Sequence, residues 1–219
     1  MPFLRHALAA LLLAASFAVA PATQAATISV QIDTNVTGNS LFITGPLASF
    51  FTAGEAIEIT LTFDDAVADG TPAAGTGTFL GAISQLDVLF PESGLSFQFG
   101  NPFSSIGTSD DIPQGNDSIA FSSASRLGGE ADVDGNIPTS ISVALLQEGA
   151  PGPPGTLVVD DRPATPFEFT SATFTLITDD SEFTQMLLDG GASTSVPEPA
   201  TALLITASLL PIALRARRR

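Results

Sequence analysis

Apolar and polar residues alternate along most of the central part of the chain. In the segment EAIEITLTFDD, Ile57, Ile59 and Leu61 fall on one face of an extended chain, and Glu58 and Thr60 fall on the other. A period of two with β-branched and aromatic residues is typical of a strand that buries one face. The same alternation recurs in TISVQID, SLFIT, SQLDVLF, GLSFQFG, DSIAFSS, TSISVALL and FEFTSATFTLIT, and TLVVDD is a short apolar run.

Clusters of Gly, Pro, Asn and Asp separate these segments. They include VADGTPAAGTG, FPESG, FGNPFSS, DIPQGND, DVDGNIP and EGAPGPPG. Such residues supply turn conformations and end strand pairing. Many short strands with frequent turns are typical of an antiparallel all-β domain. We therefore predict an antiparallel β-sandwich, jelly-roll-like in its strand order, over residues 26–189.

The end of this domain is less clearly patterned. The segment DDSEFTQMLLDGG, residues 179–191, fits a short helix because Phe183, Met186 and Leu187 have helical spacing, but it fits a last strand equally well. Residues 190–195, GGASTS, are small and polar, which is typical of a flexible linker. We expect them to be a tether.

The first residues have the pattern of a secretory signal peptide. A basic start is followed by an apolar run at residues 7–20 and by small residues in PATQAAT. We expect residues 1–25 to form a signal-peptide helix, and cleavage after Ala22, Ala25 or Ala26 would suit this pattern. An uncleaved anchor or a buried helix is the alternative.

The last residues have the pattern of a short membrane segment. Fifteen mostly apolar residues, Ala200–Leu214, are followed by Arg215, Arg217, Arg218 and Arg219. A helix of that length spans about 22 Å, less than the roughly 30 Å of a bilayer core, so it is a poor permanent anchor. The arginines predict a cytoplasmic C-terminus, with the helix in the inner membrane. An ordinary single-span anchor and a GPI-attachment signal are the alternatives.

The sequence VPEPA, the short apolar segment and the terminal arginines occur in the order and spacing of a known signal. Together they resemble the PEP-CTERM sorting domain of proteins exported by Gram-negative bacteria that make extracellular polysaccharide. The resemblance covers residues 195–219, and we assign the sorting signal to residues 196–219. Its motif consists of Val196, Pro197, Glu198 and Pro199.

This resemblance implies processing near the motif by an exosortase, a membrane cysteine-type transpeptidase. The protein would be anchored transiently in the inner membrane and then delivered to the cell envelope, the cell surface or the extracellular matrix. The β-rich middle of the chain is also similar to the body of such proteins, which carries no defined activity. We expect a non-catalytic structural or adhesive role in exopolysaccharide or biofilm, with extracellular polysaccharide as a partner.

The charge of the chain excludes several partners and chemistries. The sequence has 23 acidic and 7 basic residues, and its net charge is −16. Arg126 and Arg162 are the only basic residues between the two terminal segments, and there is no Lys. Nucleic acid and anionic lipid surfaces are therefore not expected partners, since binding to phosphate needs Lys and Arg. No Cys is present, and the single His lies in the signal peptide, which excludes most nucleophilic and transition-metal designs.

One internal motif has the composition of a calcium loop. In GGEADVDGNIP, the oxygen-bearing side chains are Glu130, Asp132, Asp134 and Asn136. Calcium takes six to eight oxygen ligands, and alternating acids around Gly135 could supply several. The spacing of Gly135 does not fit an EF-hand. A non-EF calcium site is one interpretation and a tight turn between strands is the other; we expect no further cofactor.

Pairs of aspartates recur at the strand ends. They are Asp64-Asp65, Asp110-Asp111, Asp160-Asp161 and Asp179-Asp180. Two facing carboxylates could serve a glycosidase-type reaction, but the sequence does not give their separation. Trp and Tyr, which commonly stack on sugars, are absent. A lectin-like or carboxylate-dependent carbohydrate-active module is thus the alternative to a structural role, and we do not expect an enzyme.

Overall fold

The fold was obtained as a computed structural model of the chain. It describes residues 27–71, 73, 75–111, 116–129, 132–148, 158–159, 162–163 and 165–195. The expected signal peptide (1–25) and sorting signal (196–219), including the motif residues Val196–Pro199 and the four terminal arginines, lie outside these residues. Within the described part of the chain, no helix is long and apolar enough to cross a membrane.

Most of the described residues lie in strands, as the alternation predicts. FGNPFSS, predicted to separate two strands, instead lies within the single strand Leu95–Asp111. The strands are β1 (Thr27–Asn35), β2 (Ile43–Thr44), β3 (Ala56–Asp64), β4 (Thr76–Leu80), β5 (Ile83–Phe90), β6 (Leu95–Asp111), β7 (Asn116–Gly129), β8 (Pro138–Gln147), β9 (Val158–Val159), β10 (Arg162–Pro163), β11 (Glu168–Thr178) and β12 (Phe183–Ser195). Two single turns of 3₁₀ helix, η1 (Ser40–Phe42) and η2 (Ala48–Phe50), lie between β1 and β3.

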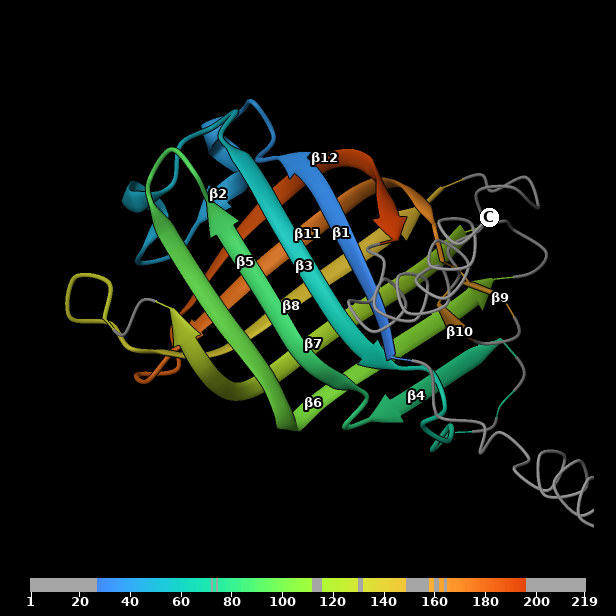
Figure 1. The fold of residues 1–219 in the computed structure, drawn as a ribbon. Coiled ribbons are helices and arrows are strands. Elements are labelled where there is room, and N and C mark those ends of the chain that lie inside the picture. The colour runs from blue at the N-terminus through green and yellow to red at the C-terminus, as the bar shows by residue number, and fades with distance from the viewer. Residues whose placement is uncertain are drawn as a thin grey trace, which may run out of the picture.

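The strands form one antiparallel sheet that closes on itself. Its order is β1-β3-β5-β6-β7-β8-β11-β12, and β12 pairs again with β1 (Figure 1). β2 adds to β12 and β4 adds to β6, while β9 and β10 form a separate two-stranded sheet. The result is an eight-stranded antiparallel barrel.

The prediction of an antiparallel all-β domain is therefore confirmed, but the sandwich and jelly-roll arrangement is not. A sandwich consists of two stacked sheets with separate edges. Here the pairing of Val30 with Ser195 and of Ile32 with Ser193 joins the first strand to the last, so the sheet has no edge between β1 and β12. Closure is one way in which β proteins remove unpaired edges.

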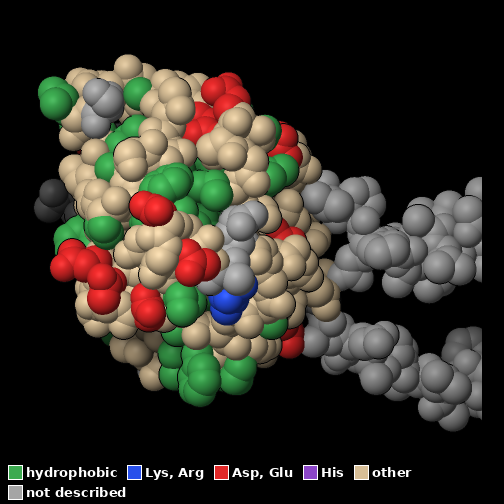
Figure 2. Space-filling view, turned by 90° about the vertical axis from the view of Figure 1, so that its left-hand side faces the viewer, with side chains coloured by type: hydrophobic (Ala, Val, Ile, Leu, Met, Phe, Trp, Pro, Cys, Tyr) green, Lys and Arg blue, Asp and Glu red, His purple; other side chains and the backbone are tan. Residues whose placement is uncertain are grey.

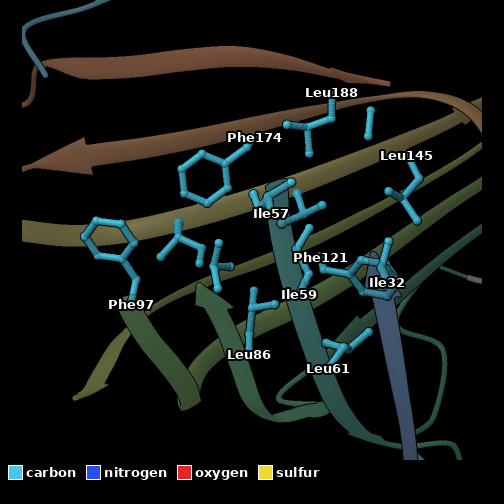
Figure 3. Close-up of a cluster of buried hydrophobic side chains, with 14 of the residues drawn as sticks. Ile32, Ile57, Ile59, Leu61, Leu86, Phe97, Phe121, Leu145, Phe174 and Leu188 are labelled. Atoms are coloured by element: carbon cyan, nitrogen blue, oxygen red, sulfur yellow. The ribbon is translucent and has the colours of Figure 1, made fainter. Parts of the chain in front are cut away.

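Side chains from all the barrel strands fill the interior. Figure 3 shows Phe97 and Leu86 on one wall and Phe174 and Leu188 on the opposite wall, converging on the same space. The centre of the aromatic cluster is Phe90, whose ring lies 4.8 Å from that of Phe51 and 5.5 Å from that of Phe174. The inward faces are those predicted from the alternation, because a strand points every second side chain to the same side.

The last strand corrects the expected end of the domain. Residues 190–195, expected to be a tether, form the last part of β12. Ala192 pairs with Glu168 of β11, and Ser193–Ser195 pair with β1. The segment 179–191 is a turn followed by this strand. Of its two predicted forms, helix and strand, the strand is therefore confirmed.

Both ends of the described chain lie at the same end of the barrel. β1 begins there at Thr27, and β12 ends there at Ser195, which pairs with Val30 of β1 (right-hand side of Figure 1). We call this the terminal end. β4, β9 and β10 also lie there, whereas η1, η2 and the β5–β6 turn lie at the opposite end (Figure 1).

Candidate functional site

A pocket of about 260 Å³ lies at the terminal end of the barrel. One side of the pocket is formed by β4 and the second half of β6, which pair with each other. The start of β1 and the end of β3 form the other side. The strand segments and the β10 region each contribute to its walls. The lining residues are Ile28, Phe63, Asp64, Asp65, Phe79, Ile106, Arg162, Pro163 and Thr165.

The guanidinium of Arg162 is the distinctive group of this pocket. It lies over the ring of Phe79, 4.8 Å from the ring centroid. Its Nη1 donates to the carbonyl of Asp65, and its Nη2 donates to the carbonyl of Val67 at 3.1 Å. A guanidinium stays charged and presents its donors in a fixed plane, so these contacts fix its orientation. Arg162 thereby holds β10 to the loop after β3.

Acidic residues surround this cation. Asp64 and Asp65 line the pocket, and the Asp64 carboxylate accepts the N–H of Ala66 at 2.9 Å. Asp69 accepts the N–H groups of Thr78 and Thr71, both at 2.8 Å. These two hydrogen bonds hold the pKa of Asp69 below its ordinary value, with a smaller contribution from Arg162. Because Thr78 belongs to β4, Asp69 also covers part of that strand's outer edge.

A layer of buried polar side chains lies on the inner faces of β6, β7 and β8. Its members are Thr108, Asp117 and Gln147, each less than a tenth exposed. Asp117 pairs with Gln147 across β7 and β8, and with Asp110 across β6 and β7. The sequence contains a signal for this layer. In DSIAF, Asp117 falls on the same face as the buried apolar residues, and in VALLQ, Gln147 does the same.

The predicted calcium loop forms the tight turn between β7 and β8. Val133 and Asn136 pair with each other, and Asp134 (φ 55°) and Gly135 (φ 81°) occupy the two central positions. Two residues with positive φ make a type I′ turn, which is favoured by Asp-Gly. Asp132 accepts the N–H of Gly135, so this carboxylate already serves the turn.

Further hydrogen bonds within the motif also belong to the turn. Asp132 and Asp134 are exposed, and the amide nitrogen of Asn136 donates to the carbonyls of Val133 and Asp134, both at 3.2 Å. Glu130 lies outside the described residues. Within the part of the chain that the structure describes, no three acidic or histidine side chains gather closely enough to hold a metal ion.

The four aspartate pairs fall in different surroundings. Asp64-Asp65 is the pair that lines the pocket. Asp179 accepts the N–H of Ile137, and Asp180 accepts the hydroxyl of Thr178 at 2.6 Å, so both serve the β11–β12 turn. Asp110-Asp111 ends β6, and Asp160-Asp161 lies outside the described residues. The structure therefore brings one pair, and a cation that no sequence motif marked, to the pocket.

The surface repeats the charge imbalance of the sequence. Figure 2 shows the face at the left of Figure 1, where acidic side chains lie at several places and basic side chains at one. Arg126, at the C-terminal end of β7, is exposed and donates to the carbonyl of Gly129 at 3.3 Å. The acidic side chains of this face disfavour the approach of phosphate groups.

No protein-family model matches the chain, and the comparisons with curated proteins and with solved structures also gave no match.

Proposed function

We propose that this chain is an exported protein sorted by an exosortase to the cell surface or the extracellular matrix. Its role there is structural or adhesive, within exopolysaccharide or biofilm. The observation that carries the proposal is the order of VPEP, a short apolar segment and terminal arginines at residues 196–219. An apolar segment of that length is better suited to temporary than to permanent anchoring.

The boundaries of the barrel support this reading of the tail. The pairings that the structure describes for the closed sheet run from Thr27 to Ser195. The proposed signal peptide ends just before the first described strand, and the proposed sorting motif begins directly after the last. Removal of both segments would leave the eight described barrel strands in place, so we expect the processed protein to keep its fold.

The shared exit of the two segments also supports the proposal. β1 starts and β12 ends at the terminal end of the barrel (Figure 1). Four residues separate Ser195 from the apolar segment, so the two are at most about 18 Å apart. Before processing, the terminal end would face the membrane and the opposite end would face away from it.

The acidic surface fits an extracellular role. Twenty-two carboxylates and two arginines lie between the terminal segments. A high net charge keeps a protein soluble and prevents self-association. It also favours an uncharged polysaccharide partner, or one bridged by divalent cations, over a polyanion.

The proposal is tested by comparing two variants in the producing bacterium. Replacement of Pro197, Glu198 and Pro199 by Ala removes the motif, whereas Thr201→Ala changes one residue of the apolar segment and serves as the control. We expect the motif variant to remain in the membrane fraction with its tail intact, and the control to be released like the unaltered protein. Release of the motif variant at the normal level would overturn the proposal.

A further inference from the structure

We propose that the pocket at the terminal end binds a small, uncharged and mainly apolar molecule that carries one hydrogen-bond acceptor. Alcohols and ketones with one six-membered ring belong to this class. The proposal is independent of sorting and would add a ligand-binding function to the exported barrel. Three observations support it: the apolar walls of the pocket, the hydrogen-bond donors of Arg162, and the charged side chains around the pocket.

The walls of the pocket are a continuation of the barrel core. Phe63, Phe79 and Ile106 are each no more than 3% exposed, and all three line the pocket. Pro163 and Ile28 add further apolar surface. An apolar cavity of about 150 Å³ is enough to bind benzene, so about 260 Å³ admits a ring with a short side chain. Mouths of barrels are common places for such sites.

The anchor for the ligand is Arg162. Two of its N–H donors are directed at the carbonyls of Asp65 and Val67, and its plane is fixed against Phe79. A guanidinium has five N–H donors and no acceptor. A ligand that meets this group must therefore bring an acceptor, such as a hydroxyl or carbonyl oxygen.

The charges around the pocket select an uncharged ligand. Asp64 and Asp65 line it, and Asp69 is close enough to Arg162 for its pKa to respond to that charge. An anion would meet the carboxylates of Asp64 and Asp65 beside the guanidinium. A cation would give up its hydration against apolar walls next to the positive charge of Arg162. An uncharged ligand avoids both costs.

The test uses three probes with the same ring and different head groups. They are 2-phenylethanol, phenylacetate and 2-phenylethylamine, each titrated to about 10 mM because so few atoms allow only weak affinity. The protein is taken as it is isolated from the producing bacterium. Methyl NMR signals of Ile28 and Ile106, which line the pocket, report binding, and Ile141 of β8 is the control.

We expect 2-phenylethanol to shift the Ile28 and Ile106 signals, while the two charged probes bind at least about tenfold more weakly. Arg162→Met keeps the apolar stem and removes the donors, and we expect it to weaken 2-phenylethanol binding by about tenfold. If this variant does not fold, the affinities of the three probes for the unaltered protein test the proposal without it. The absence of any shift, or tighter binding of phenylacetate or 2-phenylethylamine, would overturn the proposal.

Discussion

Glu55 is a completely buried carboxylate at the end of the barrel opposite the pocket. Its Oε2 accepts the N–H of Thr52 at 3.0 Å, and its Oε1 accepts the N–H of Ser93 at 2.7 Å. The side chain therefore ties the loop after η2 and the β5–β6 turn to the start of β3. Burial of a carboxylate is costly unless it is hydrogen-bonded, which these two backbone donors achieve.

We predict that Glu55→Ala lowers the free energy of unfolding by about 2–4 kcal/mol, because two hydrogen bonds to a charged group are lost and two donors remain buried. Glu55→Gln keeps the shape and an acceptor and should cost less. Glu58→Ala, at an exposed position of β3, is the control. Urea denaturation measures all three, and equal losses for Glu55→Ala and Glu58→Ala would contradict the structural role.

Asp87 on β5 differs from Glu55 in that only one of its two carboxylate oxygens accepts a hydrogen bond from the described residues. Its Oδ1 is buried and makes no hydrogen bond to the residues that the structure describes, while Oδ2 accepts from Gln85 at 2.7 Å. Desolvation raises the pKa of Asp87 above its ordinary value, and the Gln85 hydrogen bond opposes this only in part. The folded state therefore binds this proton more tightly than the unfolded state does.

This difference predicts a pH-dependent effect of Asp87→Asn. Below the unfolded pKa of 3.8 both states are protonated and Asp87 costs nothing. As the pH rises above 3.8, the unfolded state loses this proton first, so the free energy of unfolding falls until the pH has passed the folded pKa. Asp87→Asn should thus raise the Tm at pH 7 and change it less at pH 3, as measured by thermal unfolding at both values. A Tm gain that grows towards pH 3 would contradict this assignment.

At the scale of the elements, the strands follow from the sequence and the end of β12 does not. A period of two is a local signal, and it predicts the inward faces of β3, β5, β7, β8 and β11. The segment GGASTS carries no such signal, because its residues are small and polar. The structure shows why they are small: a Cβ on Gly190 would lie 2.7 Å from the carbonyl oxygen of Thr170, and one on Gly191 would lie 2.9 Å from the ring of Phe169.

Residues 190–195 also close the barrel. Ser193 is buried, its Oγ accepts the N–H of Phe167 at 2.9 Å, and its N–H donates to the Phe167 carbonyl at 2.8 Å. Ser193 also pairs with Ile32 of β1, and Thr194 and Ser195 pair with Gln31 and Val30. A composition that resembles a linker is here a strand because its partners come from distant parts of the chain.

We predict that a chain ending at Asp189 is much less stable than a chain ending at Ser195. The shorter chain lacks the pairing of β12 with β1 and the hydrogen bonds of Ser193, and its Tm should fall by on the order of 10 °C. Thermal unfolding followed by circular dichroism compares the two. The same Tm for both chains would show that residues 190–195 act as a tether after all.

At the scale of the whole molecule, closure and the pocket are long-range features. The sandwich prediction rested on strand number and turn spacing, which do not say whether β1 meets β12. The pocket likewise combines Ile28, Phe79, Ile106 and Arg162 from separate segments. Arg162 stands in no motif, and only the rarity of basic residues in the middle of the chain marked it. The proposed terminal signals can be predicted from the sequence because each is a continuous segment.

The closed barrel and its terminal segments lead to one central claim, that residues after the barrel are a removable sorting signal. Mass spectrometry of the C-terminus of the extracellular protein tests this most directly. We predict an end near Pro197, directly after the last residues of β12, with the apolar segment and the arginines absent. Extracellular protein that still ends at Arg219 would contradict the claim.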